Sequence, residues 1–190
     1  MKKLAILLAI ALELAVSGCG NSTPTSTITT TASSASWEAQ LTGGTGQASL
    51  LNFVVTFSVN TTGPLDVTGF SFFNQGACFA TTANSQTVSG TTTLTTTATD
   101  TVTGPFALTI KSNSNSNTLQ LTGTVTGTSS GTTTTIGNLS NGVVVGTWTL
   151  NSSDSNCTGG VTNPSGTFVM CQGAATCSVT SAAAETIEKL

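Results

Sequence analysis

The residues of this chain that could do chemistry are five cysteines and a few carboxylates. The 190-residue sequence contains no His or Tyr, and its four basic residues are all lysines. A Ser-His-Asp or Cys-His nucleophile cannot be built without histidine, and imidazole-based metal hydrolysis is excluded for the same reason. Lys111 lies beside Ser112, but a Ser-Lys pair needs a desolvated lysine, and this polar segment predicts a solvated one. We therefore assign no catalytic residue.

Carboxylates could still support acid–base chemistry. A glycosidase needs only two carboxyl groups at a fixed separation, and four acids of the body could supply them: Glu38, Asp66, Asp100 and Asp154. Sugars are usually held by aromatic faces, whereas most of the eight Phe residues lie in patterns typical of a buried core. A carboxylate-dependent glycan hydrolase is therefore the third-ranked function.

A possible cation site lies in the acidic segment near the third cysteine. Asp154, Asn156 and Thr158 place oxygen ligands at alternate positions before Gly159, which resembles the opening of an EF-hand loop. The twelfth position holds Ser165 in place of the bidentate Glu, and no flanking helix is predicted. A hairpin loop is the favoured interpretation, with a weak calcium site as the alternative and no cofactor expected.

The first eighteen residues have the pattern of a secretory signal. A basic start is followed by the apolar run Leu4 to Leu12 and by the small residues Val16-Ser17-Gly18. The apolar run is too short to span a bilayer, which takes about 20 residues. We predict that residues 1–18 are a signal peptide.

Cys19 directly follows this signal, and Val16-Ser17-Gly18-Cys19 resembles the lipobox of bacterial lipoproteins. The resemblance implies that Cys19 is acylated after cleavage and that three acyl chains hold the protein stably on a membrane. Gly20 stands where an Asp would favour the inner membrane, so the resemblance implies the outer membrane of the cell envelope.

Composition divides the mature chain into three parts. Residues 19–36 form a Ser/Thr-rich tether that cannot order itself, 37–180 form the folded domain, and 181–190 form a fraying tail. Without residues 1–18, two lysines remain against six acids, a net charge of −4. Because no basic patch exists, we predict no nucleic-acid partner.

The domain reads as all-β because its apolar residues recur with period two. Phe53, Val55 and Phe57 alternate with polar or exposed positions, which is typical of a strand with one buried face. About eight such segments follow one another: 37–41, 51–59, 65–72, 87–98, 106–110, 119–125, 143–150 and 166–171. Turn residues and no amphipathic helices separate them, so the strands must pair as an antiparallel meander. We predict a small up-and-down, lipocalin-like β-barrel, with a β-sandwich as the alternative.

Four cysteines besides Cys19 predict two disulfides in an oxidising compartment. In a meander, loops that leave strands of the same parity lie at the same end. Cys78 follows the third predicted strand and Cys157 follows the seventh, so we predict that these two pair and that Cys171 pairs with Cys177.

Threonine is concentrated in the strands, as in Thr91 to Thr97 and Thr124 to Thr135. Such arrays resemble the Thr-x-Thr ranks of ice-binding β-solenoids, but no fixed repeat period is visible. Exposed Thr is also a good strand former on a neutral surface, and this is the favoured interpretation.

As a whole the chain resembles small Ser/Thr-rich all-β lipoproteins of soil bacteria, on the evidence of its lipobox, tether, Trp37 and Gly146-Thr147-Trp148. Gly-Thr-Trp is similar to a motif in the first strand of lipocalin-like and avidin-like barrels, but here it lies in the penultimate strand, so no ligand site is carried over. We predict a non-catalytic binding module with a glycan, an apolar ligand or a protein partner in the envelope. The alternative is a structural or adhesive surface lipoprotein.

Overall fold

The computed structural model describes residues 35–44, 48–58, 62–73, 78–80, 85–97, 99–129 and 135–173, all of which belong to the unit Ala32–Leu190. The predicted signal, Cys19, most of the tether, Cys177 and the tail lie outside the described residues. In the described part of the chain, no helix has the length and apolar character needed to cross a membrane.

The domain is built from β-strands with very little helix. The strands are β1 (Ala35–Gly43), β2 (Phe53–Phe57), β3 (Thr62–Pro64), β4 (Val67–Phe72), β5 (Gln86–Thr93), β6 (Thr95–Thr96), β7 (Thr101–Ser112), β8 (Thr118–Ser129), β9 (Leu139–Asn151) and β10 (Ser165–Gln172). Two 3-10 turns, Ala48–Leu51 and Ile136–Asn138, and one four-residue helix, α1 (Ser155–Thr158), complete the described elements.

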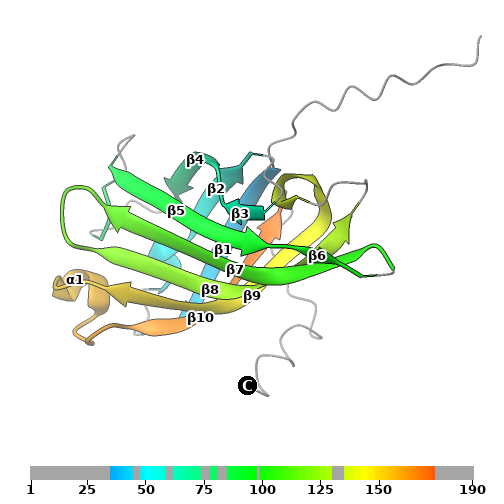
Figure 1. The fold of residues 1–190 in the computed structure, drawn as a ribbon. Coiled ribbons are helices and arrows are strands. Elements are labelled where there is room, and N and C mark those ends of the chain that lie inside the picture. The colour runs from blue at the N-terminus through cyan, green and yellow to red at the C-terminus, as the bar shows by residue number, and fades with distance from the viewer. Residues whose placement is uncertain are drawn as a thin grey trace, which may run out of the picture. The chain divides into compact units, whose positions relative to one another are not determined.

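All strands join one antiparallel sheet in the order β3-β5-β7-β8-β9-β10-β1-β2-β4, with β6 paired to β7. Figure 1 shows β5, β7, β8, β9 and β10 running side by side as a long curved wall, with α1 at one end. The predicted antiparallel all-β meander is confirmed, and because one sheet contains every described strand, the sandwich alternative is not what forms.

The two edge strands of this sheet are consecutive along the chain. β3 pairs with β5 and β4 pairs with β2, and only Leu65 and Asp66 separate them. At this point the Leu65 amide donates to the Gly90 carbonyl, and the Ser58 amide donates to the Asp66 carbonyl. The chain therefore passes from one edge of the curled sheet to the other through Leu65 and Asp66. Counting β3 with β4 and β5 with β6 gives the eight long strands of the prediction.

The interior is filled by the inward-facing apolar side chains of the alternating strands. Phe53, Val55 and Phe57 are fully buried, as their period-two pattern predicts. The largest buried side chains are Trp37 and Trp148, and aromatic rings contact one another across the interior, for example Phe57 and Phe106 at 6.2 Å between centroids. Burial of this apolar surface at about 25 cal/mol per Å² is what stabilises a domain with so few charges.

Two segments that the sequence indicates as turns lie inside strands instead. Thr103-Gly104-Pro105 belongs to the middle of β7, and Asn141-Gly142 lies in β9, where the pairing with β8 shifts register. Asn141 takes a positive φ of 53°, which suits a bulge as well as a turn. A second bulge lies in β4 next to Gly69, at Thr68, which the pairing of β4 with β2 leaves out.

Candidate binding face on the outer wall

The cysteines that the structure describes fall into two groups. Cys171 is disulfide-bonded, but its predicted partner Cys177 lies outside the described residues. Cys78 and Cys157 are both buried and both free thiols, so the predicted disulfide between them is not formed in this structure. The strand-parity argument nevertheless predicts that both lie at one end of the barrel, and there the Asn117 side chain reaches both residues: its Nδ2 is 2.6 Å from the Cys78 carbonyl oxygen and 3.7 Å from Cys157 Sγ.

The Cys78 thiol lies in an environment that disfavours its thiolate form. Burial raises the pKa of the Cys78 thiol well above its ordinary value, and the hydrogen bond and charge of Cys157 and the charge of Asp154 raise it further. The thiolate is the nucleophilic form of cysteine. Cys78 is therefore a buried thiol and not an exposed nucleophile.

The four candidate carboxylates are held in separate places. Gln40 donates to Glu38 Oε1 over 3.2 Å, and the Ser58 hydroxyl donates to Asp66 Oδ2 over 2.5 Å. Asp100 precedes β7 and Asp154 follows β9, and the antiparallel pairing puts these two positions at opposite ends of the wall.

The three candidate calcium ligands, Asp154, Asn156 and Thr158, lie at the N-cap and within the single turn of α1. Asp154 is the N-cap of α1, and its Oδ1 accepts from the Asn156 amide over 2.9 Å. Thr158 is buried in the same turn. Among the described residues, no group of three or more His, Cys, Asp or Glu side chains is arranged to hold a metal ion. Asp154 therefore serves as an N-cap, and its carboxylate satisfies the backbone amide of Asn156.

Lys111 and Ser112 lie on opposite faces of β7. Lys111 is exposed on the outside, and Ser112 is buried with its hydroxyl near Ser114 Oγ at 3.2 Å. Alternation along the strand separates the two side chains. No Ser-Lys pair forms between these neighbours.

The outer wall carries a row of threonines that the sequence does not reveal. Strand register aligns six outward positions directly across six strands, namely Thr91, Ala107, Thr122, Thr147, Thr167 and Thr42. We call this set the threonine row. Neighbouring hydroxyls in it approach each other: Thr42 and Thr167 Oγ1 are 2.9 Å apart, and Thr122 and Thr147 Oγ1 are 3.5 Å apart. The members of the row therefore follow one another across the wall at the strand spacing of about 4.8 Å.

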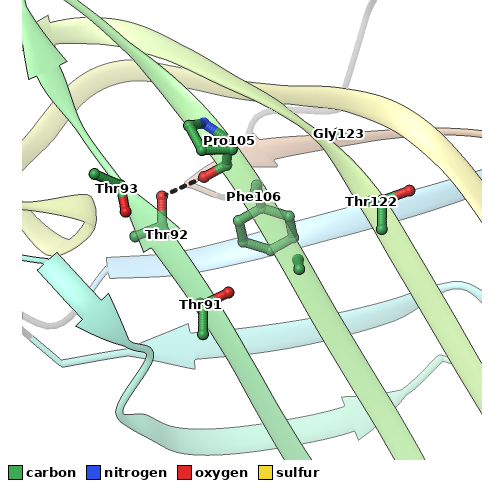
Figure 2. Close-up of a pocket in the computed structure, with 8 residues that line it drawn as sticks. Thr91, Thr92, Thr93, Pro105, Phe106, Thr122 and Gly123 are labelled. Carbon is green, nitrogen blue, oxygen red and sulfur yellow. Dashed lines mark hydrogen bonds between the residues drawn. The ribbon is translucent and has the colours of Figure 1, made fainter.

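The one non-threonine member of the row lies at a shallow depression. Thr91 and Thr93 of β5 and Thr122 of β8 flank Pro105 and Ala107 of β7 around a hollow of about 310 Å³ (Figure 2). Pro105 is exposed and Ala107 is partly exposed, so both face the outside of β7. The lining of the hollow thus combines threonine hydroxyl groups with apolar side chains.

Pro105 explains why this part of the wall is irregular. A proline has no amide to donate to the neighbouring strand, and the pairing of β7 with β5 and β6 is interrupted here before it resumes in the same register. The strands can lie this close because Gly104 has no side chain. A Cβ at this position would collide with the Thr93 carbonyl. The buried Thr92 hydroxyl is satisfied by the Pro105 carbonyl over 2.9 Å, as the dashed line in Figure 2 marks.

The threonine row is electrically neutral. The charged side chains that the structure describes are Glu38, Asp66, Asp100, Lys111 and Asp154, and none belongs to the row or to the depression. Chemically, such a surface offers hydroxyl donors and acceptors with small methyl contacts.

Sequence reasoning found the threonines but not their alignment. The position of the threonine row depends on Pro105 and on the register of β7 to β10. This register is known only from the pairing of the strands in the structure. The signal for the depression in the sequence is the Thr-Gly-Pro triplet before Phe106, which resembles a turn but lies inside a strand.

Comparison of the chain with family models, curated proteins and solved structures finds no match.

Proposed function

We propose that this chain is a membrane-anchored envelope lipoprotein whose β domain is a non-catalytic binding module. The observation that carries the proposal is the neutral threonine row on the outer wall, with its depression at Pro105. The anchor rests on Val16-Ser17-Gly18-Cys19, which would attach the domain to the outer membrane through an acylated Cys19. A flexible Ser/Thr-rich tether would then present the wall to other envelope components.

The outer wall supports this role better than the barrel interior does. A barrel that holds a ligand in its mouth needs inward space near one rim, whereas this interior holds two Trp and several Phe side chains that are buried. Phe79 stacks on Phe72 with ring centroids 4.8 Å apart at one end. The accessible surface that has both a hollow and a uniform, neutral chemistry is therefore the outer wall.

The chemistry of the wall favours a neutral polysaccharide. Its hydroxyl groups can exchange hydrogen bonds with sugar hydroxyls, and its methyl groups, Ala107 and Pro105 can contact the apolar faces of the rings. Each such contact is weak, so affinity would come from many equivalent contacts along a repeating polymer. Because no charge takes part, binding should depend little on salt.

A sedimentation assay tests this face. The protein is incubated with insoluble cellulose, chitin or β-glucan, and the bound fraction is measured in low and high salt. Thr122→Lys places a solvated charge in the row and should reduce the bound fraction at least tenfold. Thr68→Lys, at an exposed position on β4 outside the row, is the matched control and should bind as the wild type does. Absence of wild-type binding, or equal binding by both variants, would contradict the proposal.

A second experiment tests the anchor. Protein purified from bacterial membranes should have the mass of residues 19–190 plus about three acyl chains. Cys19→Ser should move the protein from the membrane fraction to the soluble fraction. A mass without lipid, or an unchanged distribution of the variant, would remove the membrane from the proposal and leave the binding face to be judged alone.

A structural or adhesive role is the alternative, and one observation favours it. Val143, Val145 and Val169 face outward on β9 and β10 and are partly exposed, and Val145 and Val169 are directly paired across the strands. This apolar strip continues the wall beside the threonine row and could pack against a second copy. Concentration-dependent sedimentation that disappears in Val145→Ser would favour this role over glycan binding.

A further inference from the structure

Three connections of the chain meet at one end of the barrel. Cys78 lies in the connection between β4 and β5, Asn117 ends the turn between β7 and β8, and Cys157 lies in α1 between β9 and β10. Asn117 is buried, and its Nδ2 donates to the Cys78 carbonyl over 2.6 Å and approaches Cys157 Sγ at 3.7 Å. One amide side chain thus bridges the backbone of one connection and the thiol of another.

The residues around Cys78 are fixed against the barrel end. Phe79 is buried and stacks on Phe72 of β4, and the Gln86 side chain donates to the Ala80 carbonyl. On the opposite side, Asp154 caps α1 and fixes the position of Cys157. The two cysteines are therefore held beside the same Asn117 side chain by elements that are each anchored independently.

We propose that Cys78 and Cys157 are an oxidation site whose disulfide locks the connection between β4 and β5 onto the end of the barrel. In the reaction both S–H bonds break, one S–S bond forms between the two Sγ atoms, and two protons leave. The two electrons reduce the disulfide of an oxidant, either a small molecule or a thiol–disulfide oxidoreductase, to two thiols. The inference is independent of the binding face and needs only an oxidising compartment.

The burial of the pair decides when the exchange can occur. Exchange needs a thiolate that can reach the oxidant, and in the folded domain Cys78 is 2% exposed and Cys157 is 1% exposed. The bond should therefore form while the chain folds, before the connection docks. Once formed it is shielded, so reductants should open it only slowly in the native protein.

The position of Lys111 provides a direct test. Lys111 is the one basic residue between Lys3 and Lys189, and it separates Cys78 from Cys157 along the chain. Full-length protein is exported in bacteria, its free thiols are blocked with N-ethylmaleimide in urea, and it is cut by a lysine-specific protease. Without reductant, the two fragments should migrate as one species, and reductant should separate them.

Variants identify which cysteines hold the fragments together. Cys78→Ala should separate the fragments without reductant, whereas Cys171→Ala, which removes a different disulfide, should leave them joined. Separate wild-type fragments with both thiols alkylated would overturn the proposal, as would a link that survives in Cys78→Ala.

A stability measurement tests the lock itself. The bond closes a loop of roughly 80 residues and should raise the melting temperature by about 10 °C. Reductant should remove this increase in wild type and have no such effect in a Cys78→Ala/Cys157→Ala variant, compared at equal reductant. Reduced protein should also form the link faster with oxidised glutathione during refolding from urea than in the folded state. Equal melting temperatures for the linked and reduced wild type, or equal rates in the two states, would refute the locking role.

Discussion

The indole Nε1 of Trp148 donates a hydrogen bond to the carbonyl oxygen of Thr42 over 2.9 Å, although their strands β9 and β1 are separated by β10. The ring crosses the intervening strand at Gly166, where a Cβ would lie 2.8 Å from Nε1. A side chain thus ties together three strands of the wall from its inner face. The Gly-Thr-Trp motif, which is similar to one found in lipocalin-like and avidin-like barrels, here supplies the Trp148 side chain that links β9 to β1.

We expect Gly166→Ala to destabilise the domain by about 1–3 kcal/mol, the usual cost of overpacking. The added methyl group would collide with the Thr42 carbonyl and press against the Trp148 ring. Urea unfolding followed by Trp fluorescence measures the change. Gly69→Ala is the matched control, because the nearest atom to its Cβ would be the Thr56 hydroxyl oxygen at 3.3 Å, a side-chain atom, and not a backbone carbonyl as at Gly166. Equal losses in both variants would mean that the crossing at Gly166 is not tight.

The two tryptophans should respond differently to replacement by Phe. Trp37 is fully buried, and among the described residues its Nε1 has no acceptor, whereas Trp148 has Thr42. Trp148→Phe removes a hydrogen bond, and Trp37→Phe removes an unpaired donor whose burial is costly. We expect Trp148→Phe to cost at least about 1 kcal/mol more than Trp37→Phe in the free energy of unfolding. The reverse order, measured by the same urea titration, would refute this.

Much of the fold could be predicted because the period-two alternation survives in most of the strands. Phe53, Val55 and Phe57 point inward as the pattern requires, and the absence of helices between strands leaves only an antiparallel meander. The strand ends were less predictable. Pro105 and Gly142 resemble turn residues locally, but neighbouring strands hold both in the sheet, so tertiary pairing overrides their local preference.

The candidate site was less visible in the sequence than the fold. Thr91, Thr122 and Thr147 are far apart in the chain, and no local feature shows that they align. Register depends on the sum of many side-chain contacts and turn lengths. The approach of Cys78 and Cys157 could be predicted, because strand parity alone decides at which end a loop lies.

Asn117→Ala should destabilise the barrel end by about 1–3 kcal/mol. The variant leaves the Cys78 carbonyl without its donor, and an unsatisfied buried acceptor carries that cost. Thermal unfolding of the reduced protein gives the comparison. Ser116→Ala, at the exposed position one residue earlier, should change stability by less than about 0.5 kcal/mol. A loss confined to Ser116→Ala, or absent from both variants, would contradict the bridging role of Asn117.

The stability of the reduced protein should fall as the pH rises above about 9. Burial raises the pKa of Cys78 above its ordinary value of 9.0, so above that pH the unfolded chain loses a proton that the folded chain keeps. The contribution of this thiol is therefore complete below pH 9 and is lost at up to about 1.4 kcal/mol per pH unit above it. Urea unfolding between pH 8 and 10.5 in the presence of reductant measures this slope. Cys78→Ala should show a shallower decline, because it lacks the titrating group. The oxidised protein should behave in the same way, since a disulfide does not titrate. Parallel declines in all three forms would mean that Cys78 loses its proton as readily in the folded domain as in the unfolded chain.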